Sequence, residues 1–105
     1  MKKHCLVDMQ AARFPIAQIQ LNAILDKFVE SEYETMSIVS VNDSLGRCIN
    51  QRISHRGLKL TLSTDVKRES ITNKDIERWQ NDYDEEDYED VLYRLHFKII
   101  KNAIN

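Results

Sequence analysis

The sequence predicts a single α+β domain with about four helices and a small antiparallel sheet, and an all-α domain is the alternative. Two observations lead to this prediction. The hydrophobic periodicity changes from helical to alternating at Thr35 and again at Gly57. The chain has 105 residues, of which 42% are hydrophobic and 30% charged, with two glycines and one proline. Such a composition is typical of one globular domain, here residues 1–105, that is rich in regular structure.

Residues 15–64 contain a predicted helix and two predicted strands. A helix over residues 15–34 is predicted because Pro15 suits the first helical position and apolar residues follow at helical spacing: Ala17, Leu21, Ile24, Leu25 and Phe28. Residues 35–41 are rich in β-branched side chains, and residues 57–64 alternate leucine with polar residues. Both segments therefore predict short strands with one buried face.

Two more helices are predicted, one between these strands and one after them. The first has a helical stripe that Gly46 weakens, formed by Leu45, Cys48, Ile49 and Ile53. The second begins at Thr72, which suits an N-cap and has Asp75 three residues later. This pair makes an imperfect capping box, because Glu or Gln is usual in place of Asp75.

Residues 91–100 fit both a helix and a strand. Alternate positions are apolar, as in a strand, at Val91, Tyr93, Leu95, Phe97 and Ile99. A helical face is formed equally well by Tyr88, Leu92, Leu95 and Ile99. We predict a helix, because acidic residues precede the segment and Lys98 and Lys101 close it, which is the charge order that a helix macrodipole favours.

The composition also bears on location. The apolar run near the N-terminus ends at Asp8 after three residues, and no stretch approaches the roughly 18 apolar residues of a membrane span. We therefore expect a cytoplasmic protein without a membrane partner. Cys5 and Cys48 are too few for a disulfide framework, and we expect them to remain thiols.

Charge is distributed unevenly along the chain. Residues 1–70 carry 10 Lys or Arg and 8 Asp or Glu, whereas residues 71–105 carry 5 and 9. The density is highest in residues 82–90, where seven carboxylates and two tyrosines occur without a cation. A calcium loop starting at Asp82 is disfavoured, because Asp87 takes the place of the required glycine and Tyr93 takes the place of the bidentate glutamate.

Two interpretations of residues 82–90 remain open. The acids form either a solvated helix start or a recognition surface for a basic partner. In the second case aromatic side chains beside them would act as anchors of the interface. The candidate partner-binding residues are Trp79, Asp82, Tyr83, Asp84, Glu85, Glu86, Asp87, Tyr88, Glu89 and Asp90.

The basic region, residues 47–68, offers an alternative site. A helix-turn-helix with Gly46 in the turn is disfavoured, because it places Arg47, Arg52 and His55 at positions that need apolar side chains. A phosphate-contacting surface without that motif stays open. Its members would be Arg47, Arg52, Arg56, Lys59, Lys67 and Arg68.

No catalytic motif is present. Pairs such as His4 with Cys5, or Cys48 with His55, lack a recognised ligand or nucleophile-base spacing, and His96 stands alone. We therefore expect no enzyme activity, no metal and no cofactor.

The sequence thus favours a small cytosolic inhibitor that binds a protein and neutralises a basic nucleic-acid-acting partner such as a nuclease toxin. In size, acidity and aromatic content it resembles bacterial immunity and anti-restriction proteins, and antitoxins act in the same way. The alternative is a small nucleic-acid-binding regulator that uses residues 47–68, although direct nucleic-acid binding is the less favoured partner class. A subunit that oligomerises through the helix at 15–34 is a third candidate.

Overall fold

The computed structural model describes residues 3–102, which form four helices and a mixed five-stranded sheet. The predicted α+β class is confirmed. The strands are β1 (His4–Asp8), β2 (Thr35–Ser40), β3 (Leu60–Leu62), β4 (Lys67–Ser70) and β5 (Tyr93–Lys101). The helices are α1 (Ile16–Glu30), α2 (Leu45–Arg56), α3 (Asn73–Asp82) and α4 (Glu85–Tyr88).

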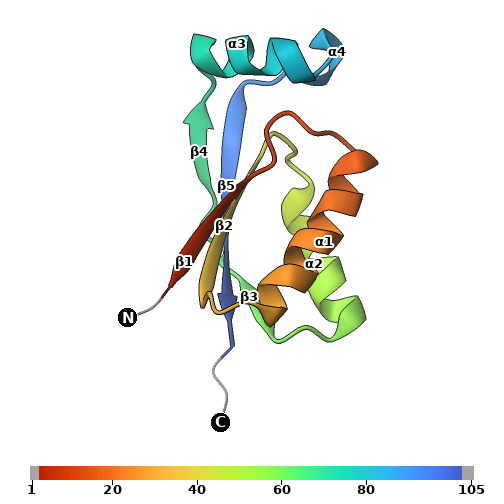
Figure 1. Ribbon diagram of the computed structural model, residues 1–105, viewed down its shortest axis with the longest axis vertical. Helices are drawn as coiled ribbons and strands as arrows, with labels where there is room; N and C mark the ends of the chain where they lie inside the picture. The colour runs from red at the N-terminus through yellow and green to blue at the C-terminus, as the bar shows by residue number, and fades with distance from the viewer. Residues whose placement is uncertain (1–2, 103–105) are drawn as a thin grey trace.

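The sheet is built around β5. Its strand order is β1-β2-β5-β3, and β4 also pairs with β5. β1 runs parallel to β2, whereas every pair that includes β5 is antiparallel, so the sheet is mixed and not wholly antiparallel as predicted. α1 and α2 cover one face of the sheet, and α3 and α4 lie across the end to which the β1 and β2 arrows point (Figure 1).

The predicted helix over residues 91–100 is wrong, because these residues form most of β5. Alternate residues of β5 point toward α1 and α2 and are buried, namely Leu95, Phe97 and Ile99. A central strand with three neighbours satisfies its backbone through the sheet, and this pairing outweighs the helix-favouring order of the flanking charges. The acids of residues 82–90 therefore do not open the helix that was predicted to follow them.

α1 ends four residues earlier than predicted. Ser31 adopts an extended conformation, and its hydroxyl donates a hydrogen bond to the Phe28 carbonyl at 2.7 Å. The buried side of α1 contributes Ala17, Leu21, Leu25 and Phe28 to the main core. The helix predicted between the two strands is α2, which packs beside α1. Gly46 permits a close approach of α2 to β5, because an added Cβ would lie 3.2 Å from the Phe97 ring.

The C-terminal end of α2 depends on a left-handed glycine. Gly57 has φ of 61°, and in the described part of the chain no atom beyond its sequence neighbours lies within 4 Å of an added Cβ. Gly57→Ala is therefore expected to lower the free energy of unfolding by about 1 kcal/mol through backbone strain alone. Gly57→Asn is the matched control and should lose less, because asparagine tolerates this conformation better. Urea unfolding measures both, and an alanine variant as stable as the parent would contradict the prediction.

Candidate protein-binding surface

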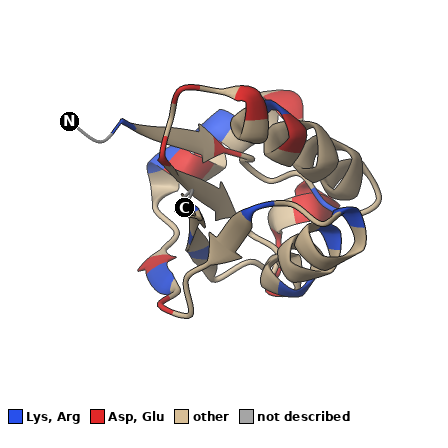
Figure 2. Ribbon diagram, turned by 90° about the horizontal axis from the view of Figure 1, so that it is seen from below, with Lys and Arg blue, Asp and Glu red and all other residues tan. Residues whose placement is uncertain are grey.

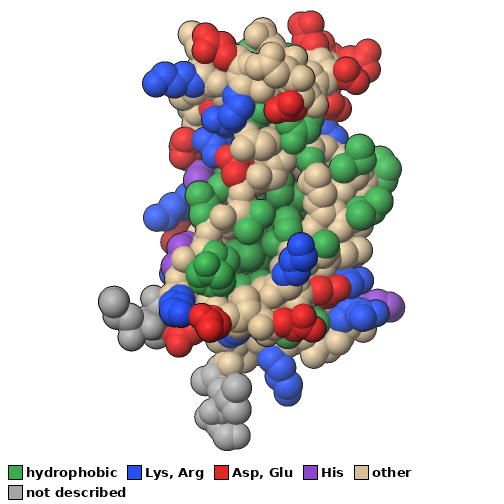
Figure 3. Space-filling view, viewed as in Figure 1, with side chains coloured by type: hydrophobic (Ala, Val, Ile, Leu, Met, Phe, Trp, Pro, Cys, Tyr) green, Lys and Arg blue, Asp and Glu red, His purple; other side chains and the backbone are tan. Residues whose placement is uncertain are grey.

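The acidic run forms a cap at one end of the molecule. We define the acidic cap as residues 82–90, which comprise the last residue of α3, all of α4 and the residues around it. Six of its seven carboxylate residues are exposed, and Asp87 is half-buried. Figure 3 shows acidic side chains gathered at this end, over α3 and α4. The structure thus brings the predicted carboxylates together on one exposed surface.

None of the cap carboxylates has an ion-pair partner within residues 3–102. The ion pairs found within residues 3–102 use five other acids: Asp8, Asp26, Glu32, Glu69 and Asp75. Like charges placed close together repel one another, and here no cation of the described chain relieves that repulsion at ion-pair distance. The cap therefore carries a high density of negative charge that no ion pair within residues 3–102 offsets.

A helix start accounts for only part of the cap. Asp84 and Asp87 form a capping box at the N-terminus of α4, and Glu85 and Glu86 lie in its first turn, where negative charge is favourable. Asp82 is the last residue of α3 and Glu89 is the C-cap of α4. Negative charge is unfavourable at these helix ends, so local helix energetics do not explain the acids there.

Trp79 supports the cap from inside and does not present its ring to solvent. Its side chain is only 1% exposed and packs in a small cluster with Ala11 and Val41. The Tyr88 ring lies 5.9 Å from it, centroid to centroid. The indole N–H donates a hydrogen bond to Gln10 Oε1 at 2.9 Å. Trp79 was predicted as an interface anchor, but it is a core residue that fixes α3 to the loop after β1.

Tyr83 and Tyr88 are half-buried, so each offers only part of its ring at the cap surface. Tyr83 packs against both hydrophobic clusters. Burial raises the pKa of the Tyr83 hydroxyl above its usual value of 10.0, and the negative charges of Asp82, Asp8 and Asp87 raise it further. The hydroxyl therefore remains protonated at neutral pH and can act as a hydrogen-bond donor.

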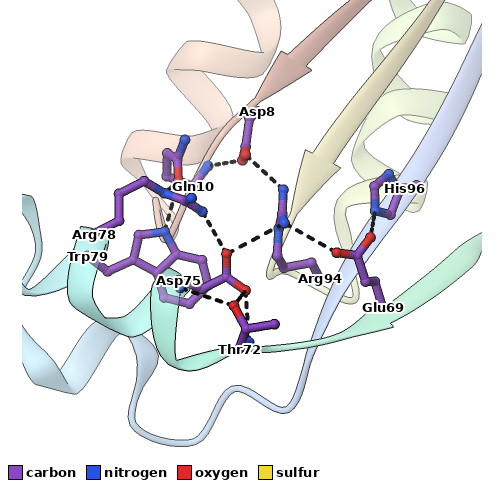
Figure 4. A network of polar contacts seen from close by, with 9 residues as sticks. All are labelled: Asp8, Gln10, Glu69, Thr72, Asp75, Arg78, Trp79, Arg94 and His96. Atoms are coloured by element: carbon purple, nitrogen blue, oxygen red, sulfur yellow. Dashed lines mark hydrogen bonds and ion pairs between the residues drawn. The ribbon is translucent and has the colours of Figure 1, made fainter.

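A polar network joins α3 to the sheet beneath the cap (Figure 4). Asp75, 3% exposed, completes the predicted capping box with Thr72 and accepts a hydrogen bond from Arg78 at 2.8 Å. Arg94 of β5 lies 3.6 Å from the same carboxylate and pairs with Asp8 at 2.8 Å. The network therefore ties α3 to both β1 and β5.

The charge state of Asp75 follows from these contacts. Burial raises the pKa of its carboxyl, but hydrogen bonds from the Thr72 backbone N–H and hydroxyl oppose this effect. The charge of Arg94 and a hydrogen bond from Arg78 act in the same direction, and the pKa lies below its usual value of 3.8. Asp75 is thus a buried carboxylate held ionised by its neighbours.

Gln10 is a functional residue of this site that no sequence pattern indicated. Its backbone has φ of 53°, an uncommon conformation for a residue other than glycine. Its side-chain oxygen accepts from both Trp79 and Arg78, the latter at 2.8 Å, while its N–H donates to Asp8. These bonds hold the loop after β1 against α3.

A cleft of about 640 Å³ opens between the cap and the loops that follow β1 and β2. Arg13 and Arg68 line it together with three cap acids, Glu86, Asp87 and Asp90. Both arginines line the same cleft as these acids, but within residues 3–102 neither forms an ion pair with them. This side of the cap is therefore mixed in charge.

The basic region does not form one surface. Arg47, Arg52 and Arg56 lie on α2, and Arg52 pairs with Asp26 of α1 at 3.1 Å. Lys67 belongs to β4 and lies opposite His96 in the sheet, on the face that α1 and α2 leave open. Cationic segments are accordingly spread around the molecule (Figure 2). The predicted phosphate-contacting set is divided between separate parts of the fold.

The candidate catalytic residues are also separate. His4 contacts Thr35 and Ser37, His96 contacts Glu69, and His55 is exposed on α2. Both cysteines are free, and burial raises the pKa of the Cys5 thiol, opposed by the nearby Lys101 charge. Within residues 3–102, no group of three or more His, Cys, Asp or Glu is placed to hold a metal ion.

Comparison with known proteins finds no matching family model, no matching curated protein and no matching solved structure. None of the helices in the described part of the chain has the length and apolar character needed to cross a membrane.

Proposed function

We propose that this protein binds a basic protein through its acidic cap and neutralises it, in the manner of an immunity protein or antitoxin. The observation that supports the proposal most directly is the set of seven cap carboxylates without an ion-pair partner in residues 3–102. Unpaired charge at helix C-terminal ends costs stability, and a cationic partner would offset that cost on binding.

A nucleic-acid-acting protein fits this surface best. Proteins that bind duplex DNA carry Lys and Arg in their grooves, because the duplex presents a dense row of phosphate charges. A rigid array of carboxylates can occupy such a groove, and its field raises the rate of association. The platform of Trp79, Gln10 and Asp75 holds the array in place, which reduces the entropy lost on binding.

The test removes part of the negative charge of the cap without disturbing the start of α4. The triple variant Asp82→Asn, Glu89→Gln, Asp90→Asn removes three charges and leaves the capping box of Asp84 and Asp87 intact. The matched control, Glu30→Gln, Glu34→Gln, Asp65→Asn, removes three exposed charges far from the cap in sequence. The control should unfold within about 0.5 kcal/mol of the parent. The cap variant should be at least as stable as the parent, because it loses no ion pair within residues 3–102 and removes two negative charges from helix C-terminal ends.

The cap variant and the control should differ in their affinity for the partner protein. Protein captured from the source cell by the parent should be basic, should elute as salt rises, and should bind the cap variant at least tenfold more weakly at low salt. If the captured protein is a nuclease, the parent should block its cleavage of DNA at a one-to-one ratio. Equal affinity for the parent, the cap variant and the control would contradict the proposal.

A further inference from the structure

The free edge of β1 is the strongest unassigned feature of the fold. Within residues 3–102, β1 pairs only with β2, so the other side of the strand has no strand partner there. The Thr35 N–H donates to the Lys3 carbonyl at 3.3 Å, and the Met9 N–H donates to the Val39 carbonyl at 2.8 Å. The N–H and C=O groups of successive residues in a strand point to opposite sides. Those of Lys3 and Met9 point to β2, so those of His4, Leu6 and Asp8 point to the open side.

These outward groups have no backbone partner within residues 3–102. Proteins usually protect such an edge with central lysines, proline or a bulge, and the middle of β1 has none of these. Leu6 stands at the centre of the strand with its side chain 63% exposed. An edge of this kind is suited to pairing with another strand.

Apolar hollows accompany the edge on its helix side. One of about 250 Å³ is lined by Cys5, Val7, Ile24, Phe28 and Tyr33, among others. A second, of about 330 Å³, shares Val7 and Ile24 with it. Figure 3 shows hydrophobic side chains along this stretch, between β1 and α1 as they lie in Figure 1. A strand added to β1 would place its own helix-side residues over these hollows.

We propose that the occupant is β1 of a second copy, added antiparallel to form a symmetric dimer with a continuous sheet. With Leu6 on the twofold axis, Leu6 meets Leu6, and His4 meets Asp8 of the other copy. All three outward-facing residues then exchange backbone hydrogen bonds. Shifting the strand by two residues removes the Leu6 pair and leaves one outward-facing residue of each β1 without a strand partner, so this register satisfies the most backbone groups.

The same register pairs Cys5 with Val7 of the second copy on the helix side. Cys5 and Val7 of each copy then lie over the hollows of the other copy, which buries apolar surface that the single chain leaves open. Cys5 and the facing Val7 form a non-hydrogen-bonded pair, and in such pairs the two Cα atoms lie about 4.5 Å apart. This spacing lies within the range that a disulfide spans.

Sedimentation velocity over a concentration series tests the dimer. The parent should sediment as a dimer, and Leu6→Lys should raise the dissociation constant at least tenfold while keeping the circular dichroism spectrum and melting temperature of a folded chain. Leu92→Lys is the matched control, because Leu92 is 72% exposed in the segment before β5 and should leave the dimer unchanged. A parent that is monomeric up to millimolar concentration would overturn the proposal and assign the edge to a different protein.

Crosslinking tests the register independently of the acidic cap. Val7→Cys should give a covalent dimer under mild oxidation, through Cys5 of the second copy, and the double variant Val7→Cys, Cys5→Ser should give none. A dimer that persists in Leu6→Lys and fails to crosslink in Val7→Cys would show that association uses another surface, such as α1, and would overturn the β1 pairing.

Discussion

Trp79→Ala is expected to lower the free energy of unfolding by about 4 kcal/mol. The side chain is 1% exposed and is the largest member of the small cluster beneath the cap, so its removal leaves a cavity between α3 and the loops after β1 and β2. The hydrogen bond to Gln10 is lost as well. Urea unfolding followed by circular dichroism measures the effect.

Two variants serve as controls for Trp79→Ala. Trp79→Phe keeps an aromatic ring but removes the indole N–H, so it should cost less than half as much as alanine. Leu92→Ala truncates a side chain that is 72% exposed and should change the free energy by less than about 0.5 kcal/mol. Near-parental stability of Trp79→Ala would show that α3 is not held by this side chain, and the cap would then lack a rigid platform.

The sequence indicated α3 and its N-cap correctly but not the role of Trp79. Thr72 and Asp75 are close in sequence, and their capping box depends only on local geometry. The burial of Trp79 depends on Ala11 and Val41, which come from distant loops and carry no sequence signal for this contact. An aromatic residue next to acids was therefore assigned to the surface, although it lies beneath it.

β5 shows why an ambiguous pattern can be resolved in the wrong direction. Leu95 and Ile99 are buried in either a helix or a strand, and only Phe97 distinguishes the strand face. The charges at the ends of the segment were taken as helix signals. Lys101 instead makes a tertiary contact, with its ammonium 5.1 Å from the Phe28 ring centroid, and the acids form the separate cap.

The two missed strands had weak local signals. β1 has only three consecutive apolar residues, and its pairing with β2 is a long-range contact. All four residues of β4 are exposed, so burial leaves no hydrophobic pattern, and β4 is defined by its register with β5. The exposure of the cap carboxylates was easier to predict, because charged side chains are rarely buried and seven of them lie close together in the sequence.

Asp75→Ala is expected to lower the free energy of unfolding by about 3 kcal/mol at neutral pH. The substitution removes the N-cap partner of Thr72 and leaves Arg94 and Arg78 without this carboxylate. Arg94 is the more costly of the two, because its side chain is mostly buried. Thr72→Ala is the control for the cap alone and should cost about 1 kcal/mol, so the difference between the variants reports the ion pairs.

The effect of Asp75→Ala should depend on pH in one direction. The folded-state pKa of Asp75 lies below the usual 3.8, so the unfolded chain binds the proton more readily than the folded chain does. The carboxylate therefore contributes its full stability above that usual value, and the contribution is lost as pH falls through the folded-state pKa. In urea unfolding at stepwise lower pH, the gap between the parent and Asp75→Ala should narrow in acid. A gap that stays constant, or widens, would show that the variant acts by altered packing alone and that Arg94 does not depend on the Asp75 charge.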